Sequence, residues 1–406
     1  MAYITDRLKQ NPRSVVIRSS LSSLQWLAWF TVLLGITVVF SFLMMRKGPG
    51  TSFLAWLVYL SGIAIILYKP RYGIYLVVCF GLAGDTILSP WFPFVKNFSS
   101  RESLLFVDDA LIINPLETYL VLIYLSWFIH SVSQRKLQIY RGVLLPPILA
   151  FMIFVIFGLG YGVVYTRGNL NIALWEARPL FYLAFMVFLV SNLLEKREHA
   201  INLVWAAMIG IFLEGVSGNI YFWFTLQASL AGVNEITEHP AAIHMNTLFV
   251  FFLAAWLYKV SPTKRFALGM MLPIVLITYM ATQRRAAFIA IAGALIVIAF
   301  LLSMENRRVF WTILPVIVPL FAGYMLIFWN SSNALGLPAQ AVKGVIAPNR
   351  ASIADQRSNA YRDIENINLN FTIRQKPFTG IGFGQKFYVI IPLPDISFFQ
   401  WWQYFR

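Results

Sequence analysis

Met280-Ala281-Thr282-Gln283-Arg284-Arg285-Ala286-Ala287 separates two long apolar runs, at roughly 266–281 and 286–303. Each run has about the length that a helix needs to cross a bilayer, and almost no loop remains for the two arginines between them. A guanidinium at a membrane boundary either anchors the chain on the cytoplasmic side or holds an anion on the other side. The function of Arg284 and Arg285 therefore depends on the topology of the whole chain.

The composition places the chain in a membrane. Hydrophobic residues make up 59% of the 406 residues and charged residues 12%, and the mean hydropathy is +0.69. A soluble fold has too little interior to bury so much apolar surface. The net charge of +15 is scattered between apolar runs, which is the pattern of the positive-inside rule and excludes nucleic acid as a partner.

The apolar runs predict an all-α polytopic membrane protein with about eleven transmembrane helices, because runs this continuous exclude a β-barrel. They lie at roughly 25–45, 52–68, 72–92, 113–131, 143–166, 174–194, 200–224, 240–258, 266–281, 286–303 and 309–329. We expect a cytoplasmic N-terminal tail at 1–24, a transmembrane bundle at 25–329 and a periplasmic loop region at 330–406. The first run has no cleavage site after it and is interpreted as an uncleaved anchor.

The distribution of Lys and Arg gives the orientation. With the N-terminus inside, the cytoplasmic segments hold 16 of these residues and the opposite loops hold 7. This assignment puts Arg284 and Arg285 on the outer face, where an anchor is not needed. With one helix fewer, the pair would return to the cytoplasm and would be an ordinary anchor.

Ionisable residues inside a bilayer are costly and usually functional. In this topology they gather in the outer half of the membrane, which predicts a cavity open to the periplasm. A route through the whole membrane would need polar residues in both halves. The residues of this outer set are Asp85, Glu117, Glu176, Arg178, Glu214 and His244.

Arg178 opens the sixth run in Trp175-Glu176-Ala177-Arg178-Pro179-Leu180. The planar fork of an arginine binds phosphate oxygens in a bidentate way and keeps its charge in any environment. Arg178 is therefore a candidate anion ligand, and the alternatives are a local pair with Glu176 or an arginine that extends to the interface. His239 and His244 are candidate general bases, with hydrogen-bonded interface histidines as the alternative.

Metal chemistry has little support in the sequence. The four histidines have no H-x-x-x-H spacing, and the single cysteine, Cys79, lies inside an apolar run. We expect no metal and no cofactor.

The region from 330 onward predicts one amphipathic helix over about 352–374. Ala360, Ile364, Ile367 and Phe371 recur at i, i+4, i+7 and i+11 and form one apolar stripe along that helix. Arg357 and Arg362 fall outside the stripe and are expected to face the membrane cavity.

A glycine-rich turn follows, with Gly380, Gly382 and Gly384 in Lys376-Pro377-Phe378-Thr379-Gly380-Ile381-Gly382-Phe383-Gly384. No βαβ pattern surrounds it, which argues against a dinucleotide site. We expect its backbone amides to be free for an anion.

These residues resemble the O-antigen ligase and O-antigen polymerase superfamily of bacterial inner-membrane enzymes. The resemblance rests on three segments in a shared order: Glu176-x-Arg178-Pro179-Leu180, Gln283-Arg284-Arg285-Ala286, and Arg362-Asp363-x-Glu365 with Lys376-Pro377-x-x-Gly380-x-Gly382-Phe383-Gly384. It covers most of the chain by helix pattern and about 40 residues by motif.

The resemblance implies a metal-independent transfer of a glycan from undecaprenyl diphosphate to an acceptor hydroxyl, on lipid A–core or on a growing polysaccharide. It also implies that Arg178, Arg284 or Arg285, and an arginine of the loop helix hold the diphosphate. The family's periplasmic histidine after the glycine turn is missing, because no histidine follows His244. We therefore expect further C-terminal helices beyond Arg406. Ligase and polymerase stay open, and a lipid-linked oligosaccharide or anion transporter and an assembly subunit are the rival interpretations.

Overall fold

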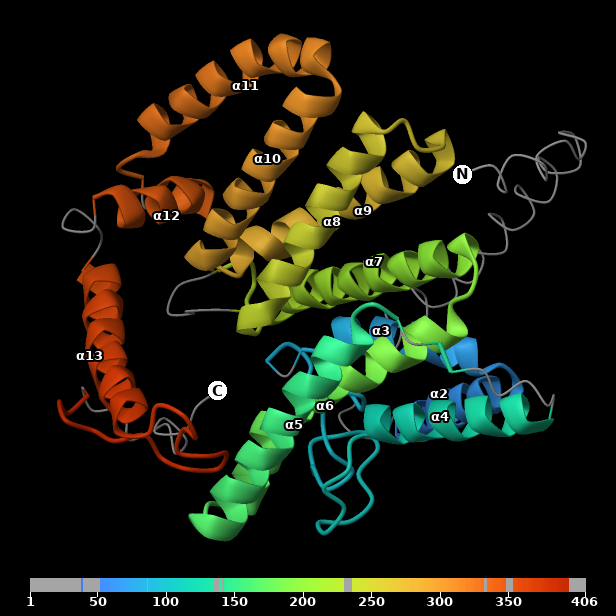
Figure 1. The fold of residues 1–406 in the computed structure, drawn as a ribbon. Coiled ribbons are helices and arrows are strands. Elements are labelled where there is room, and N and C mark those ends of the chain that lie inside the picture. Colours follow the sequence, from blue (N-terminus) through green and yellow to red (C-terminus); the bar gives the residue numbers. More distant parts are fainter. Residues whose placement is uncertain are drawn as a thin grey trace, which may run out of the picture. The chain divides into compact units, whose positions relative to one another are not determined.

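A computed structural model describes Val38 and residues 52–393, apart from 86, 134–138, 141, 230–235, 332–333 and 348–352. The described residues form helices and no β-strand (Figure 1). The first predicted run, 25–45, therefore lies outside the described residues except for Val38, and so does the tail at 1–24.

Eight helices in the described part of the chain are long and apolar enough to cross a membrane, which makes the protein an all-helical, multi-pass membrane protein. They confirm the eight predicted runs from 113–131 onward. Two of them end in a short π-helical turn, labelled η. The elements are α4 (Pro115–Ser133), α5 (Leu145–Gly160) with η2 (Tyr161–Tyr165), α6 (Leu170–Leu193), α7 (Arg197–Ile220) with η3 (Tyr221–Thr225), α8 (His239–Leu257), α9 (Pro262–Ala281), α10 (Arg285–Glu305) and α11 (Arg307–Phe328).

Two shorter apolar helices precede them, α2 (Ser52–Tyr68) and α3 (Pro70–Ala83). The predicted run at 72–92 is wrong in its second half, because α3 ends at Ala83. Gly84 follows, and a Cβ there would lie 2.1 Å from Val95 Cγ1. The backbone at Gly84 therefore lies too close to the Val95 side chain for a larger residue. Further breakers at Pro90 and Pro93 keep the chain out of a helix.

The chain divides into two compact units. The first contains 78–117, 204–283 and the described residues up to 61. The second contains 62–77, 118–203 and the described residues from 284 onward.

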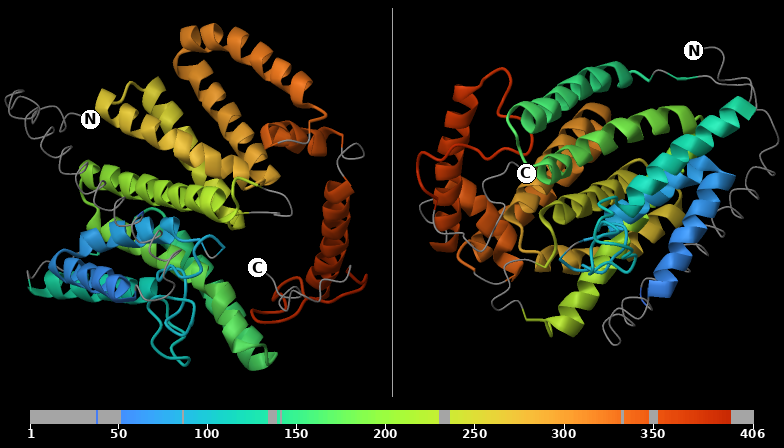
Figure 2. Two further views of the ribbon diagram at one scale, coloured as in Figure 1. Left: turned by 180° about the vertical axis from the view of Figure 1, so that it is seen from behind. Right: turned by 90° about the horizontal axis from the view of Figure 1, so that it is seen from below.

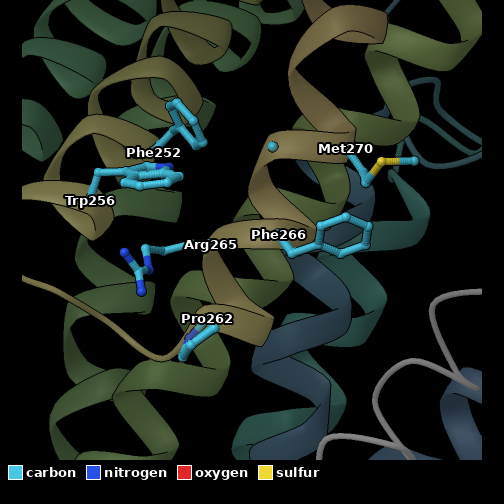
Figure 3. A pocket seen from close by; sticks show the side chains of 7 residues that line it. Phe252, Trp256, Pro262, Arg265, Phe266 and Met270 are labelled. Atoms are coloured by element: carbon cyan, nitrogen blue, oxygen red, sulfur yellow. The ribbon is translucent and has the colours of Figure 1, made fainter.

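In the first unit, α8 and α9 pack against each other as a hairpin (Figures 1 and 2). Its turn brings the Arg265 guanidinium 4.8 Å from the centroid of the Trp256 ring (Figure 3). On α7, Asn219 Nδ2 donates to Ile274 O of α9 at 2.6 Å and to Thr278 Oγ1 at 2.9 Å. Short polar side chains thus join these helices where lipid offers no hydrogen bonds.

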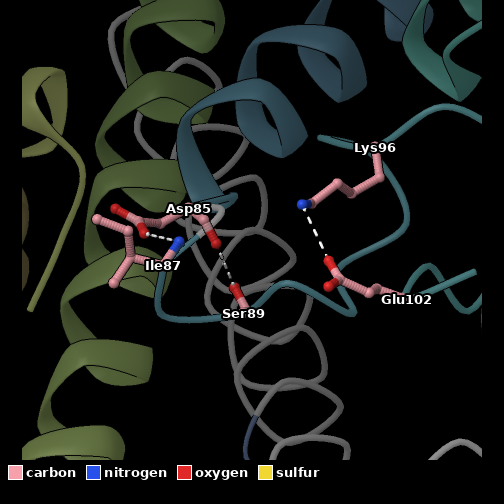
Figure 4. A network of polar contacts seen from close by, with 5 residues as sticks. All are labelled: Asp85, Ile87, Ser89, Lys96 and Glu102. Carbon is pink, nitrogen blue, oxygen red and sulfur yellow. Dashed lines mark hydrogen bonds and ion pairs between the residues drawn. The ribbon is translucent and has the colours of Figure 1, made fainter. Parts of the chain in front are cut away.

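The segment 84–114 of the first unit folds around Asp85 (Figure 4). Asp85 Oδ1 accepts hydrogen bonds from the amides of Ile87 (2.8 Å) and Leu88 (2.9 Å), and Oδ2 accepts from the Glu238 amide (2.6 Å). Asp85 is 1% exposed. Its side chain replaces the hydrogen bonds that the backbone loses where α3 ends.

In the second unit, α5 packs against α6, and α10 packs against α11 and against α12 (Leu337–Ile346) (Figure 1). The α12 helix, which follows a single 3₁₀ turn, η4 (Ala334–Gly336), was missed by the sequence analysis. The predicted helix at 352–374 is confirmed as α13 (Ile353–Gln375).

The packed face of α13 differs from the predicted stripe. Ile367 is 46% exposed, whereas Asn368 and Thr372 are buried at 0% and 2%. Asn368 Oδ1 accepts from the amides of Ile390 (2.9 Å) and Ile391 (3.0 Å), and its Nδ2 donates to Ile391 O (2.9 Å). The buried face of α13 is polar because this helix binds an irregular segment, whose backbone groups need polar partners.

Candidate functional site

The glycine-rich turn is held against the end of α5. Gly380, Gly382 and Gly384 have φ angles of +62°, +87° and +73°, which L side chains rarely adopt. A Cβ on Gly382 would lie 2.4 Å from Gly162 Cα, so the two backbones touch directly. A Cβ on Gly384 would lie 2.4 Å from Asn169 O, in the turn between α5 and α6. Gly382 and Gly384 are therefore needed for docking.

The amides of this turn are engaged within the protein. Gly384 N donates to Glu176 Oε2 at 2.8 Å, Phe383 N donates to Gly158 O at 3.3 Å, and Gly380 N donates to Lys376 O at 3.0 Å. The prediction that these amides are free for an anion is wrong for Gly380, Phe383 and Gly384. The close approach to α5 leaves them facing protein acceptors, which satisfy them.

Side chains reinforce the same junction. Gln385 Nε2 donates to Gly162 O (3.1 Å) and to Thr166 O (3.0 Å). Lys376 Nζ donates to the Tyr161 hydroxyl at 2.9 Å, and this hydrogen bond raises the pKa of Lys376. Phe383 also packs on an apolar cluster of α5 and α6. The segment 376–385 is thus fastened to the α5–α6 turn by backbone, polar and apolar contacts together.

Two of the predicted arginines interact electrostatically in the second unit. Arg284 is the N-cap of α10 and is partly buried, and Arg362 is exposed on α13. Burial lowers the pKa of Arg284, and the positive charge of Arg362 lowers it further. Arg285, the first residue of α10, lies beside α12: its Nη1 would be 3.5 Å from a Cβ on Gly344. The start of α10 is thus positively charged and lies beside α12.

The other predicted site residues are placed as follows. Arg178 is partly buried in α6, two residues after Glu176. His244 lies in α8, which belongs to the first unit. The backbones of Arg357 and His239 belong to α13 and α8, but their side chains lie outside the described part.

The expected outer polar set divides between the two units. Asp85, Glu214 and His244 belong to the first unit, and Glu176, Arg178 and the arginine pair belong to the second. In the first unit, Glu214 is 2% exposed and interacts electrostatically with Asp85 and Glu238. Burial raises the pKa of Asp85, against the opposing effect of its three backbone hydrogen bonds. The first unit thus holds an acidic cluster, and the predicted arginines belong to the second unit together with Glu176, while the single outer constellation stays a prediction.

No family model matches the chain, and no curated protein or solved structure is significantly similar to it. The site must therefore be argued from its own geometry.

Sequence reasoning missed Gly162, Tyr161 and Asn169 as partners of the glycine turn. Glu176 was identified only as an outer-half carboxylate, whereas it accepts the Gly384 amide through Oε2. Its Oε1 is buried and has no hydrogen-bond partner among the described residues. The three alternating glycines Gly158, Gly160 and Gly162 near the end of an apolar run were the available signal, because small residues on a helix allow another backbone to approach.

Proposed function

We propose that the protein is a glycan transferase resembling the O-antigen ligases and polymerases. It would move a glycan from undecaprenyl diphosphate to an acceptor hydroxyl, of lipid A–core or of a growing polysaccharide, at the periplasmic face of the bacterial inner membrane. The observation that carries the proposal is the electrostatic interaction of Arg284 with Arg362. These residues belong to two of the three segments on which the resemblance rests.

The third segment belongs to the same unit. Glu176, from Glu176-x-Arg178-Pro179-Leu180, accepts the amide of Gly384, from the glycine turn. Apart from Gln283, the three segments lie in one compact unit, and the third segment has a hydrogen bond with the first and an electrostatic interaction with the second. Segments that are far apart in sequence and serve one site are expected to converge in this way.

Electrostatics favour an anionic ligand at the arginines. Two guanidinium groups repel each other, and partial burial weakens the screening of that repulsion by water. An anion with several oxygens relieves the repulsion and accepts hydrogen bonds from both forks. A diphosphate ester has this chemistry, and two arginines can bind it and offset its negative charge without a metal.

The proposed reaction follows from these charges. An acceptor hydroxyl gives its proton to a base and attacks the anomeric carbon of the donor sugar. The bond from that carbon to the phosphate oxygen breaks, and its electrons go to the leaving diphosphate. Arg284 and Arg362 would stabilise the negative charge that grows on this oxygen, and removing one such donor typically costs about 10²–10³ in rate.

The succession of spans supports one common face for the site. If α4 to α11 each cross the membrane, the α5–α6 turn, the start of α10 and the chain after α11 share one side. The count of Lys and Arg assigns this side to the periplasm. Lys69, Arg71, Lys196 and Arg197 fall on the opposite side in the same scheme.

Glycan transfer in membranes tests the proposal. Arg284→Ala should lower the rate by about 10²–10³, and Arg284→Lys should retain part of it, because lysine keeps the charge and loses the bidentate fork. Arg362→Ala should also lower the rate. The matched control is Arg374→Ala, an exposed arginine in the last turn of the same helix α13, which should leave the rate within about twofold.

A second assay tests the side of the membrane. In a Cys79→Ala background, single cysteines at Ala286, Asn366 and Ser133, all exposed, are labelled in intact cells with an impermeant thiol reagent. Labelling at Ala286→Cys and Asn366→Cys, with Ser133→Cys unlabelled, supports the proposal. Labelling at Ser133→Cys alone would place the arginines in the cytoplasm and overturn it. Donor lipid crossing the membrane without glycan transfer would instead support a transporter.

A further inference from the structure

A separate pocket lies at the opposite end of the α8–α9 hairpin from the α9–α10 turn. It has a volume of about 370 Å³ and is open on one side. Figure 3 shows the side chains around it, with Arg265 beside the Trp256 ring. The lining residues are Phe252, Trp256, Pro262, Arg265, Phe266, Gly269 and Met270.

The walls of the pocket are apolar and open outward. Trp256, Phe266 and Met270 are 55%, 70% and 60% exposed. They belong to two helices with the length and composition of membrane spans, so their exposed faces lie against acyl chains. The opening of the pocket is therefore toward the bilayer and not toward bulk water.

One charged side chain stands in this apolar surrounding. The Arg265 guanidinium lies over the Trp256 ring at 4.8 Å from its centroid. Its Nε is buried and has no hydrogen-bond partner among the described residues. A buried donor of this kind is costly unless an acceptor reaches it, so the arginine favours an anionic group that enters from the open side.

The charge around the pocket has one sign. Lys259, Lys264 and Arg265 flank the α8–α9 turn, and the chain has no Asp or Glu between residues 239 and 304. The pocket also includes the first turn of α9, whose N-cap, Ser261, makes no side-chain capping bond. The positive end of the helix dipole adds to the attraction for an anion.

We infer that this pocket binds an anionic phospholipid of the adjoining leaflet. The phosphate would accept hydrogen bonds from Arg265, and the first part of one acyl chain would lie against Phe252, Phe266 and Met270. The pocket is too small for a whole lipid, and its opening toward the bilayer leaves the rest of the lipid among its neighbours. The positive-inside count assigns this end of the hairpin to the cytoplasmic leaflet. The inference does not depend on the proposed glycan transfer.

Native mass spectrometry of the purified protein tests the lipid site. Dioleoyl phosphatidylglycerol and dioleoyl phosphatidylcholine are added separately, and the number and affinity of bound lipids are counted. The wild type should hold one phosphatidylglycerol about tenfold more tightly than phosphatidylcholine, since a charged hydrogen bond distinguishes the headgroups. Arg265→Gln should abolish this difference.

Arg307→Gln is the matched control. Like Arg265, Arg307 lies in the first turn of a span, but it is exposed, and Glu305 lies two residues before it. The Arg307→Gln variant should still bind one phosphatidylglycerol as tightly as the wild type does. Gly269→Leu provides a second variant with Arg265 intact. A Cβ at Gly269 would be 3.6 Å from Phe252 Cε2, so there is room for the first carbon while the rest fills the pocket. This variant should lose the tight lipid as well.

Three results would overturn the inference. One is equal loss of phosphatidylglycerol in Arg265→Gln and Arg307→Gln, which would mean general surface attraction. The second is unchanged binding in both pocket variants. The third is displacement of the lipid by inorganic phosphate with no effect of Gly269→Leu, which would mean that the site holds a free anion.

Discussion

The contact between Gly382 and Gly162 makes a sharp prediction about how the glycine turn is held. Gly382→Ala places a Cβ 2.4 Å from Gly162 Cα and 2.6 Å from Gly162 N, at a φ of +87°. Both neighbouring atoms are backbone atoms of α5 and its π-turn, which cannot move aside as a flexible side chain does. The turn must therefore separate from α5.

The magnitude follows from what is lost. The positive φ alone costs an L-residue about 1–2 kcal/mol. Separation also removes the hydrogen bond from Gly384 N to the Glu176 side chain, which is worth about 1.5–3 kcal/mol if that carboxyl is charged. Gly380→Ala is the matched control, because it has a φ of +62° and its Cβ would lie 4.0 Å from the nearest atom. Gly382→Ala should thus be the more damaging by at least about 1.5 kcal/mol.

Hydrogen exchange measured by mass spectrometry checks this difference. A gap of about 1.5 kcal/mol corresponds to roughly tenfold faster opening of the segment 380–385 in Gly382→Ala than in Gly380→Ala. Peptides from α8, in the other unit, serve as an internal reference. Equal exchange in the two variants would refute the argument that the backbone contact holds the turn.

Three further predictions concern buried polar groups. Glu176→Ala should cost about 1.5–3 kcal/mol and speed exchange at Gly384, and a change limited to other segments would contradict the bond between them. Asn368→Ala should make residues 388–391 more sensitive to limited proteolysis, because it removes their hydrogen bonds to α13. Asn370, exposed on the same helix, is the control, and Asn370→Ala should not change the cleavage. Equal cleavage of the two variants would contradict the role of Asn368. Because burial raises the folded-state pKa of Asp85 above 3.8, protonation favours folding. Its contribution is full below pH 3.8 and is lost as the pH rises through the folded value, so the melting temperature of the wild type should fall relative to Asp85→Asn across that window. A constant difference between the two would show that Asp85 does not titrate on folding.

The membrane-spanning part of the fold was predictable because it depends on local sequence. A bilayer accepts only chains that satisfy their backbone internally, so the length and hydropathy of each run are sufficient to identify a span. The eight runs from 113–131 onward are confirmed for this reason. The error in the predicted helix at 72–92 has a local cause too. The second half of that run contains the helix breakers Gly84 and Pro90, with Pro93 directly after it, and the prediction followed the hydropathy of the run instead.

The candidate site was only partly predictable. The sequence singled out Arg284 and Arg362, and in the structure the charge of Arg362 acts on Arg284. It could not show that the glycine amides are occupied, because their acceptors, Gly158 O and Glu176 Oε2, come from helices about two hundred residues earlier. The apolar stripe on α13 did not indicate its buried residues for a similar reason. Asn368 and Thr372 are buried because they bind the backbone of residues 388–391, and apolar periodicity cannot detect a polar partner.

The sequence by itself determined that this chain is helical, crosses a membrane several times, and has paired arginines and a glycine turn after its spans. These features follow from hydropathy and residue type, which act over a few turns of helix. Only the tertiary structure decided that Gly382 touches the backbone of Gly162, that the charge of Arg362 acts on Arg284, and that Arg265 lies on Trp256. Those outcomes depend on which distant surfaces pack together, and packing is set by shape and hydrogen-bond pairing across the whole unit.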